Sequence, residues 1–114
     1  MPLSQLEKKR VEKILGEYCR NKIPLHVQNQ IKLLYTIRGN DVTLIESRPG
    51  WKNKELWTKR PIARIRYEDT TLKWHLYWPR ANGKWEKYPA FPPTNNLTKI
   101  VNEIEKDPHA TFWG

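Results

Sequence analysis

The sequence predicts an α+β domain with an N-terminal helix, an antiparallel meander sheet of four or five strands, and a C-terminal helix. Apolar residues recur at three- and four-residue spacing near both ends of the chain, whereas they alternate with polar residues between about residues 30 and 90. Short turn segments separate the alternating stretches, which favours a meander. The length of 114 residues is that of one domain, taken here as residues 1–114. We expect both helices to cover one face of the sheet.

The first helix is predicted from about Gln5 to Arg20. Ser4 and Glu7 form a capping-box pattern at its start, and Pro24 disfavours helix beyond Lys22. The expected apolar face consists of Leu6, Val11, Ile14, Leu15 and Tyr18. Cys19 follows on the same helix, and because no histidine is near it in sequence we expect an unreactive thiol.

A hairpin is predicted next, because the apolar period changes from helical to two. One face of its first strand carries Ile31, Leu33, Tyr35 and Ile37, and the other carries Lys32, Leu34, Thr36 and Arg38. Turn residues at 39–41 precede the returning strand. Residues 49–60 break the pattern with proline, glycine and charged residues, so a loop containing Trp51 and Trp57 is expected.

The alternation resumes at residue 61 and continues through a second hairpin. It places Ala63, Ile65 and Tyr67 on one face, and Ile62, Arg64, Arg66 and Glu68 on the other. The next strand carries Leu72, Trp74, Leu76 and Trp78 on one face, and Lys73, His75 and Tyr77 on the other. Asn82-Gly83 then forms a two-residue hairpin signal before the last strand at 84–88.

The second helix is predicted to start after Asn95 or Asn96 and to stop at Asp107, before Pro108. Its apolar stripe consists of Leu97, Ile100, Val101 and Ile104. The chain ends in Phe112-Trp113-Gly114, and because a free tail would gain nothing from two aromatic rings we expect them to dock against the sheet.

Positive charge is concentrated in the predicted sheet. The chain has a net charge of +9, with 21 Lys and Arg against 12 Asp and Glu, and most of the excess lies between residues 30 and 90. If the apolar faces meet the helices, a basic face with an interleaved Tyr and His is left open, composed of Lys32, Arg38, Arg64, Arg66, Lys73, His75 and Tyr77. Such a face suits phosphates and stacked bases. The leading hypothesis is therefore a non-enzymatic module that binds DNA or RNA, and a merely solvated basic face is the alternative.

Two other functions stay open. The first is a protein-interaction or accessory module that uses Trp51 and Trp57, because exposed tryptophan is favoured at interfaces. The second is a small ribonuclease-like enzyme, which needs a general base, a general acid and a cation for the phosphorane. The candidate residues for this chemistry are Glu46, Arg48, Arg66, Glu68, His75 and Tyr77. Nothing in their spacing requires them to lie close together, so we do not favour enzymatic activity.

Several classes are excluded by what the sequence lacks. No apolar run approaches the roughly 18 residues of a membrane span, and the first residues are charged where a signal peptide would be apolar. His26, His75 and His109 lack metal-ligand spacing, and there is no Gly-rich phosphate loop. We therefore expect no metal, no cofactor and no membrane partner. The single cysteine favours a reducing cytoplasm.

Four stretches of the chain resemble a bacterial family of small proteins known only as a domain of unknown function. They are ESRPGW (46–51), PIARIRY (61–67), WHLYWPRANGKWEKY (74–88) and DPHATFWG (107–114). The motifs Trp-x-Leu-Tyr-Trp, Lys-Trp-x-x-Tyr and the C-terminal Asp-Pro-x-x-x-Phe-Trp-Gly make this resemblance specific, and it covers residues 30–114. It implies a small bacterial cytoplasmic protein and no particular activity. Thr111 and Pro79 depart from the family pattern, which often has a cysteine at the first position and a longer side chain at the second.

Overall fold

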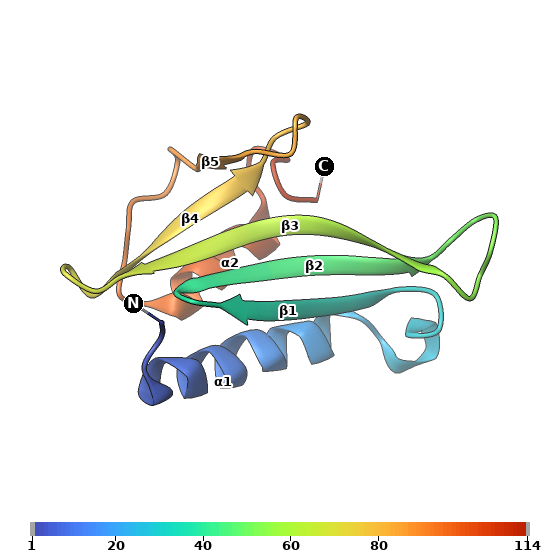
Figure 1. The fold of residues 1–114 in the computed structure, drawn as a ribbon, viewed down its shortest axis with the longest axis horizontal. Helices are drawn as coiled ribbons and strands as arrows, with labels where there is room; N and C mark the ends of the chain where they lie inside the picture. The colour runs from blue at the N-terminus through green and yellow to red at the C-terminus, as the bar shows by residue number, and fades with distance from the viewer. Residues whose placement is uncertain (1, 114) are drawn as a thin grey trace.

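One antiparallel sheet and two helices make up the computed structural model, which describes residues 2–113 (Figure 1). In chain order the elements are α1 (Gln5–Lys22), a short 3₁₀ helix η1 (Leu25–Val27), β1 (Lys32–Arg38), β2 (Asp41–Pro49), β3 (Trp57–Glu68), β4 (Lys73–Pro79), β5 (Trp85–Lys87) and α2 (Leu97–Lys106). The strands lie in the order β1-β2-β3-β4-β5, and each pairs antiparallel with its neighbour. The predicted α+β class and five-strand meander are confirmed.

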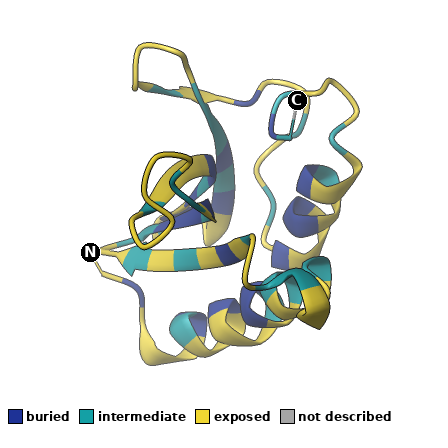
Figure 2. Ribbon diagram, turned by 90° about the vertical axis from the view of Figure 1, so that its right-hand side faces the viewer, coloured by how far each residue is buried: buried dark blue, intermediate teal, exposed yellow. Residues whose placement is uncertain are grey.

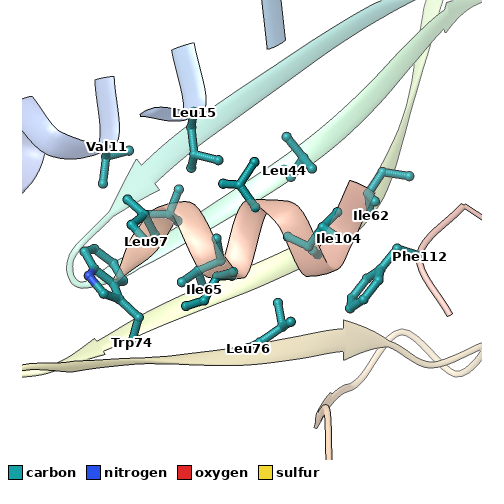
Figure 3. Close-up of a cluster of buried hydrophobic side chains, with 14 of the residues drawn as sticks. Val11, Leu15, Leu44, Ile62, Ile65, Trp74, Leu76, Leu97, Ile104 and Phe112 are labelled. Atoms are coloured by element: carbon teal, nitrogen blue, oxygen red, sulfur yellow. The ribbon is translucent and has the colours of Figure 1, made fainter. Parts of the chain in front are cut away.

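Both helices cover the same face of the sheet, and the core lies between them and the strands (Figure 2). Figure 3 shows the side chains that fill this layer. They include Val11 and Leu15 of α1, Leu97, Ile100 and Ile104 of α2, and Leu44, Ile65, Trp74 and Leu76 of the sheet. Trp74 is 2% exposed and Ile65 is fully buried. The opposite face of the sheet, called the open face below, has no helix over it among residues 2–113.

Helix α1 ends at Lys22, two residues later than predicted, and its buried face also differs. Leu6 was expected on that face but is 60% exposed, whereas Glu7 is only 8% exposed. Glu7 is followed at four-residue intervals by the buried Val11 and Leu15, so one straight line of the helix faces the core. Leu3, which precedes the helix and is 5% exposed, covers this end of the core in place of Leu6.

A β-bulge interrupts β3, and the prediction that Ile62 shares a face with Arg64 is wrong. Leu44 pairs with Ala63 and the next residue, Ile45, pairs with Pro61, which leaves Ile62 as the extra residue. Ile62 and Ala63 are consecutive and both fully buried. The bulge therefore reverses which side chains point inward, as expected where one strand carries an additional residue. Pro61 directly precedes it, a position that tolerates a residue without an N–H.

Strands β2 and β3 extend as a two-stranded ribbon beyond the end of α1 (Figure 1). The loop expected at 49–60 is therefore only residues 50–56, because Pro49 pairs with Trp57. The Gly50 N–H donates to the Leu56 carbonyl at 2.7 Å, and a Cβ on Gly50 would lie 2.8 Å from that oxygen. Only glycine allows this close approach, so the tip of the ribbon is tightly closed.

The C-terminal segment is docked through Asp107, which caps α2 with φ 42°. Its carboxylate accepts the backbone N–H groups of Thr111 at 2.7 Å, Phe112 at 3.0 Å and Trp113 at 2.8 Å. Phe112 is 2% exposed and its ring centroid is 5.0 Å from that of Tyr88. The Trp113 Nε1–H donates to the Ile104 carbonyl at 3.0 Å, so this ring packs on α2 and not on the sheet as expected. Gly114 lies outside the described residues.

Three further properties bear on the function classes considered above. Within residues 2–113, no helix is long and apolar enough to cross a bilayer. Among these same residues, no three potential metal ligands lie close enough together to hold an ion. Burial raises the pKa of the Cys19 thiol to about 11, which keeps it protonated and weakly nucleophilic at neutral pH.

Candidate nucleic-acid interface

The strand register places all of the predicted nucleic-acid-binding residues on the open face. Arg64 pairs with Tyr77, Arg66 with His75, and Glu68 with Lys73, so their side chains project to one side of β3 and β4. Lys32 and Arg38 lie at opposite ends of β1, and both are exposed. The structure thus groups Arg64, Arg66, His75 and Tyr77 at the centre of this face and leaves Lys32, Arg38 and Lys73 towards its margins.

The bulge adds residues to the open face that sequence reasoning did not assign to it. Because the reversal occurs at Ile62, the odd-numbered Trp57 and Lys59 point to the same side as the even-numbered Arg64 and Arg66. Strand β5 contributes two more side chains, since Lys87 pairs with Tyr77, and Trp85 pairs with Pro79. The two-residue turn predicted at Asn82-Gly83 would have set Glu86, not Trp85, opposite Pro79. The structure has a three-residue loop, 81–83, closed by the Arg80 N–H donating to the Lys84 carbonyl at 2.8 Å, so the predicted turn is wrong by one residue and pointed to the opposite face for Trp85 and Lys87.

Each aromatic ring on the open face has a cation above it. The Lys32 Nζ lies 4.7 Å from the centroid of the Trp57 ring. The Arg64 guanidinium lies 4.6 Å from the Trp85 ring, and the Arg66 guanidinium lies 5.2 Å from the Tyr77 ring. Distances below about 6 Å are attractive for a cation over a ring face. These pairs hold flat, positively charged surfaces against the sheet.

Cations outnumber carboxylates among the residues paired on this face. The cations are Lys32, Arg38, Lys59, Arg64, Arg66, Lys73 and Lys87, and the carboxylates are Asp41 and Glu68. Asp41 is taken up by a bidentate pair with Arg66, with distances of 2.7 and 3.2 Å. The hydrogen bonds to Asp41 raise the pKa of Arg66 above its ordinary value, so the guanidinium stays charged. An apolar strip of Leu34, Ile45 and Pro61 crosses the sheet between the Lys32 end and the central group.

A pocket of about 290 Å³ opens on this face at the β3–β4 end. The side chains that give it chemical character are Arg66, Glu68, Asp69, His75, Tyr77 and Lys87. The His75 Nε2 lies 3.5 Å from the Glu68 Oε1, and the Thr71 hydroxyl donates to the same oxygen at 2.6 Å. The Thr71 hydroxyl, and to a smaller extent the His75 imidazole, hold the pKa of Glu68 below its ordinary value.

The structure separates the other residues considered for ribonuclease chemistry from this pocket. Glu46 pairs with Leu33 and Arg60, so it projects to the helix side of the ribbon. It is 8% exposed and lies 3.0 Å from Arg48 and 3.7 Å from Arg60. Glu46 and Arg48 therefore form an ion pair within β2 on the opposite face, and Arg60 joins it from β3.

The two tryptophans proposed for protein interaction do not form one surface. Trp57 is half-buried on the open face beneath Lys32. Trp51 is 87% exposed at the tip of the ribbon, where Leu56 is 66% exposed and the Lys52 Nζ lies 5.1 Å from the Trp51 ring. Of these two tryptophans, it is Trp51 that presents a large exposed apolar side chain to a partner.

Comparison with known proteins gives one family match. The model of a family described as "Domain of unknown function (DUF3024)" matches residues 3–114. No curated protein and no solved structure matches the chain.

Proposed function

The chain belongs to this DUF3024 family of domains of unknown function, and we propose that it binds single-stranded nucleic acid through its open face. The observation that carries the proposal is the set of three cation–ring pairs on that face, Lys32 with Trp57, Arg64 with Trp85 and Arg66 with Tyr77. A cytoplasmic location, which the single cysteine favours, would bring such a module into contact with RNA.

The chemistry of these pairs suits unpaired bases. A guanidinium stacked on a ring can still donate from its remaining N–H groups to phosphate oxygens, and its outer face can receive a base. Arg64 gives its Nε–H to Thr43, and Arg66 gives two N–H groups to Asp41, so it is the other N–H groups that face a ligand. Every base has a π-face, so this mode is tolerant of sequence. The bases of a duplex are already stacked on one another, which makes a single strand the better match.

The layout of the face also supports a strand that runs along it. The central group around Arg64 and Arg66 and the outlying pair of Lys32 and Trp57 are separated by the apolar strip at Leu34, which is 40% exposed. Alternating charged and apolar patches match the phosphates and bases of one flexible strand. If the basic face contacted only solvent, there would be no physical reason for aromatic rings to lie beneath its cations.

Fluorescence anisotropy with labelled single-stranded DNA and RNA oligonucleotides of about 12 nucleotides tests the proposal. The double variant Arg64→Gln and Lys87→Gln removes two open-face charges. The matched control, Lys99→Gln and Lys106→Gln, removes the same charge from exposed positions on α2. We expect the first pair to weaken binding about tenfold or more at low salt and the second to change it little. Equal affinities for the two double variants, both with wild-type melting temperatures, would overturn the proposal.

A second candidate function has one observation in its favour, the ordered tip of the ribbon. The backbone of residues 50–56 is closed by internal hydrogen bonds, including Leu56 N–H to the Asn53 carbonyl at 3.1 Å, while Trp51 is almost fully exposed. A tryptophan held out by a rigid turn is a typical protein-contact anchor. Trp51→Ala should then weaken a protein contact and leave oligonucleotide affinity unchanged, and Trp57→Ala should do the reverse.

A further inference from the structure

The pocket on the open face combines an imidazole, two carboxylates, from Glu68 and Asp69, and two cations. The Glu68 carboxylate is held by Thr71 at 2.6 Å and lies 3.5 Å from the His75 Nε2. Arg66 and Lys87 line the same pocket. This convergence separates the pocket from the rest of the basic face, because His75 is the one histidine that the strand pairing of residues 2–113 places there.

The Glu68–His75 contact determines what the imidazole can do. The Glu68 carboxylate lies beside Nε2 at 3.5 Å, which favours placing the imidazole proton on Nε2 and leaves Nδ1 as the acceptor nitrogen. The imidazole is mostly buried, since only 17% of its side chain is exposed, so its orientation is held by the sheet. His75 is therefore arranged to take a proton from a group that enters the pocket.

The two cations are placed to hold a phosphate beside that base. Arg66 is paired directly with His75 across β3 and β4, and its bidentate contact with Asp41 fixes the plane of the guanidinium. Lys87 pairs with Tyr77 on the next strand and reaches the pocket from the other side. A phosphate between them would lie within the reach of both charges.

We propose that this pocket cleaves RNA by transphosphorylation, an activity that rests on the proposed binding function and extends it to a chemical step. The His75 Nδ1 takes the proton of a ribose 2′-hydroxyl, and the 2′-oxygen forms a bond to the adjacent phosphorus. The bond from phosphorus to the 5′-oxygen breaks, and this oxygen takes a proton from the Lys87 ammonium. The products are a 2′,3′-cyclic phosphate and a free 5′-hydroxyl, and Arg66 stabilises the charge of the phosphorane.

Glu68 acts as a positioning residue in this scheme, because it contacts His75 and not the reacting atoms. Water plays no part in bond formation, so the step needs no co-reactant. The same strand in DNA lacks the 2′-hydroxyl, and it should therefore bind to the face without being cut.

The test compares an end-labelled RNA oligonucleotide with its 2′-deoxy counterpart of the same sequence. Cleavage is followed on a gel with detection of the 2′,3′-cyclic phosphate end, and binding is measured with the 2′-deoxy strand. His75→Ala should lower the cleavage rate about 100-fold or more, and added imidazole should restore part of it. Glu68→Gln should slow cleavage although the affinity for the 2′-deoxy strand does not fall, since a negative charge is removed from the binding face, and Glu68→Asp should retain more activity than Glu68→Gln. The control variant is Lys99→Ala, on the helix side.

The outcomes distinguish this inference from the binding function. Binding of the 2′-deoxy strand without any cleavage of RNA would overturn the catalytic step and leave the binding function standing. Equal cleavage by the wild type and His75→Ala would show a contaminating nuclease and also overturn it. Failure to bind the 2′-deoxy strand would overturn the binding function itself.

Discussion

The Arg64 guanidinium lies 4.6 Å from the Trp85 ring, although the strands that carry them, β3 and β5, are separated by β4. The same guanidinium donates its Nε–H to the Thr43 hydroxyl oxygen on β2 at 3.2 Å. It is thus held between side chains of β2 and β5 and presents a flat cation on the open face.

Replacement of Trp85 by alanine should weaken single-strand binding. Stacking of a base on an aromatic surface contributes about 1–3 kcal/mol, so the affinity should fall by roughly tenfold or more. Trp85→Phe keeps an aromatic face and should lose less. Trp51→Ala, the same type of change at the ribbon tip, is the matched control and should bind as the wild type does. Anisotropy titrations of the three variants provide the measurement, and equal losses in Trp85→Ala and Trp51→Ala would contradict a role for the open face.

The salt dependence of binding should report the phosphate contacts of single residues. For single strands the slope of log K against log salt is about −0.7 per neutralised phosphate. Lys87→Ala should therefore make the slope shallower by about 0.7, while Lys99→Ala should leave it unchanged. Titrations between about 50 and 200 mM salt measure both slopes. A Lys87→Ala slope equal to that of the wild type would remove Lys87 from the contact surface.

Truncation of the chain after Thr111 should destabilise the fold. It removes Phe112, which is 2% exposed and packs against the Tyr88 ring. It also removes Trp113, whose Nε1–H donates to the Ile104 carbonyl. Loss of a buried phenylalanine costs about 3–5 kcal/mol, a large part of the stability of a small domain. Urea unfolding followed by tryptophan fluorescence measures the change, and Phe112→Leu, which keeps a buried apolar side chain, should lose less than the truncation. An unchanged midpoint would show that the tail does not stabilise the domain.

Asp107→Ala should release the same tail by a different route. The carboxylate accepts three backbone N–H groups, from Thr111, Phe112 and Trp113, and hydrogen bonds to a charged group are stronger than neutral ones. We expect a loss of about 2–3 kcal/mol in the free energy of unfolding. Asp107→Asn keeps one acceptor oxygen and the tolerance for positive φ, so it should lose less. Unfolding midpoints that rank the two variants in the opposite order would contradict this account.

The contact between the two helices should weaken in acid. Glu105 on α2 accepts from the Lys22 Nζ at 2.8 Å and from the Tyr18 hydroxyl at 2.8 Å, which lowers the pKa of Glu105 below its ordinary 4.5. A lowered pKa in the folded state stabilises the fold above the unfolded value and ceases to do so as the pH falls through the folded one. The stability difference between the wild type and Glu105→Gln should therefore be present at neutral pH and shrink below about pH 4.5. Urea midpoints of both proteins at neutral pH and at about pH 3 measure it.

The strand pattern predicted most of the open face but not all of it. Arg64, Arg66, His75 and Tyr77 were placed correctly because strict alternation determines their side of the sheet. Trp57 and Lys59 were not, because adjacent apolar residues at Ile62 and Ala63 fit either register and only tertiary packing buries both.

The pocket at the β3–β4 end was less accessible to sequence reasoning for a related reason. His75 meets Glu68 diagonally across two strands, since its direct partner is Arg66. A diagonal contact depends on sheet twist and on side-chain rotamers, which the order of residues does not reveal. Tertiary packing also explains why Leu6 was wrongly predicted to be buried. Leu3 and Glu7 pack at this end of the core instead, so the helix turns Leu6 towards solvent.

The ribbon of β2 and β3 gives the molecule uneven resistance to opening. Its outer part, from Arg48 to Arg60, is mostly exposed, whereas Val42, Leu44 and Ile65 further along the same strands are almost fully buried. Amide protons near the tip should exchange with solvent through small local fluctuations, and those beside the helices only when the whole domain unfolds. The end of the open face that carries Lys32 and Trp57 is therefore more flexible than the part of the sheet packed against the helices. Its angle can adjust to a ligand bound along the face.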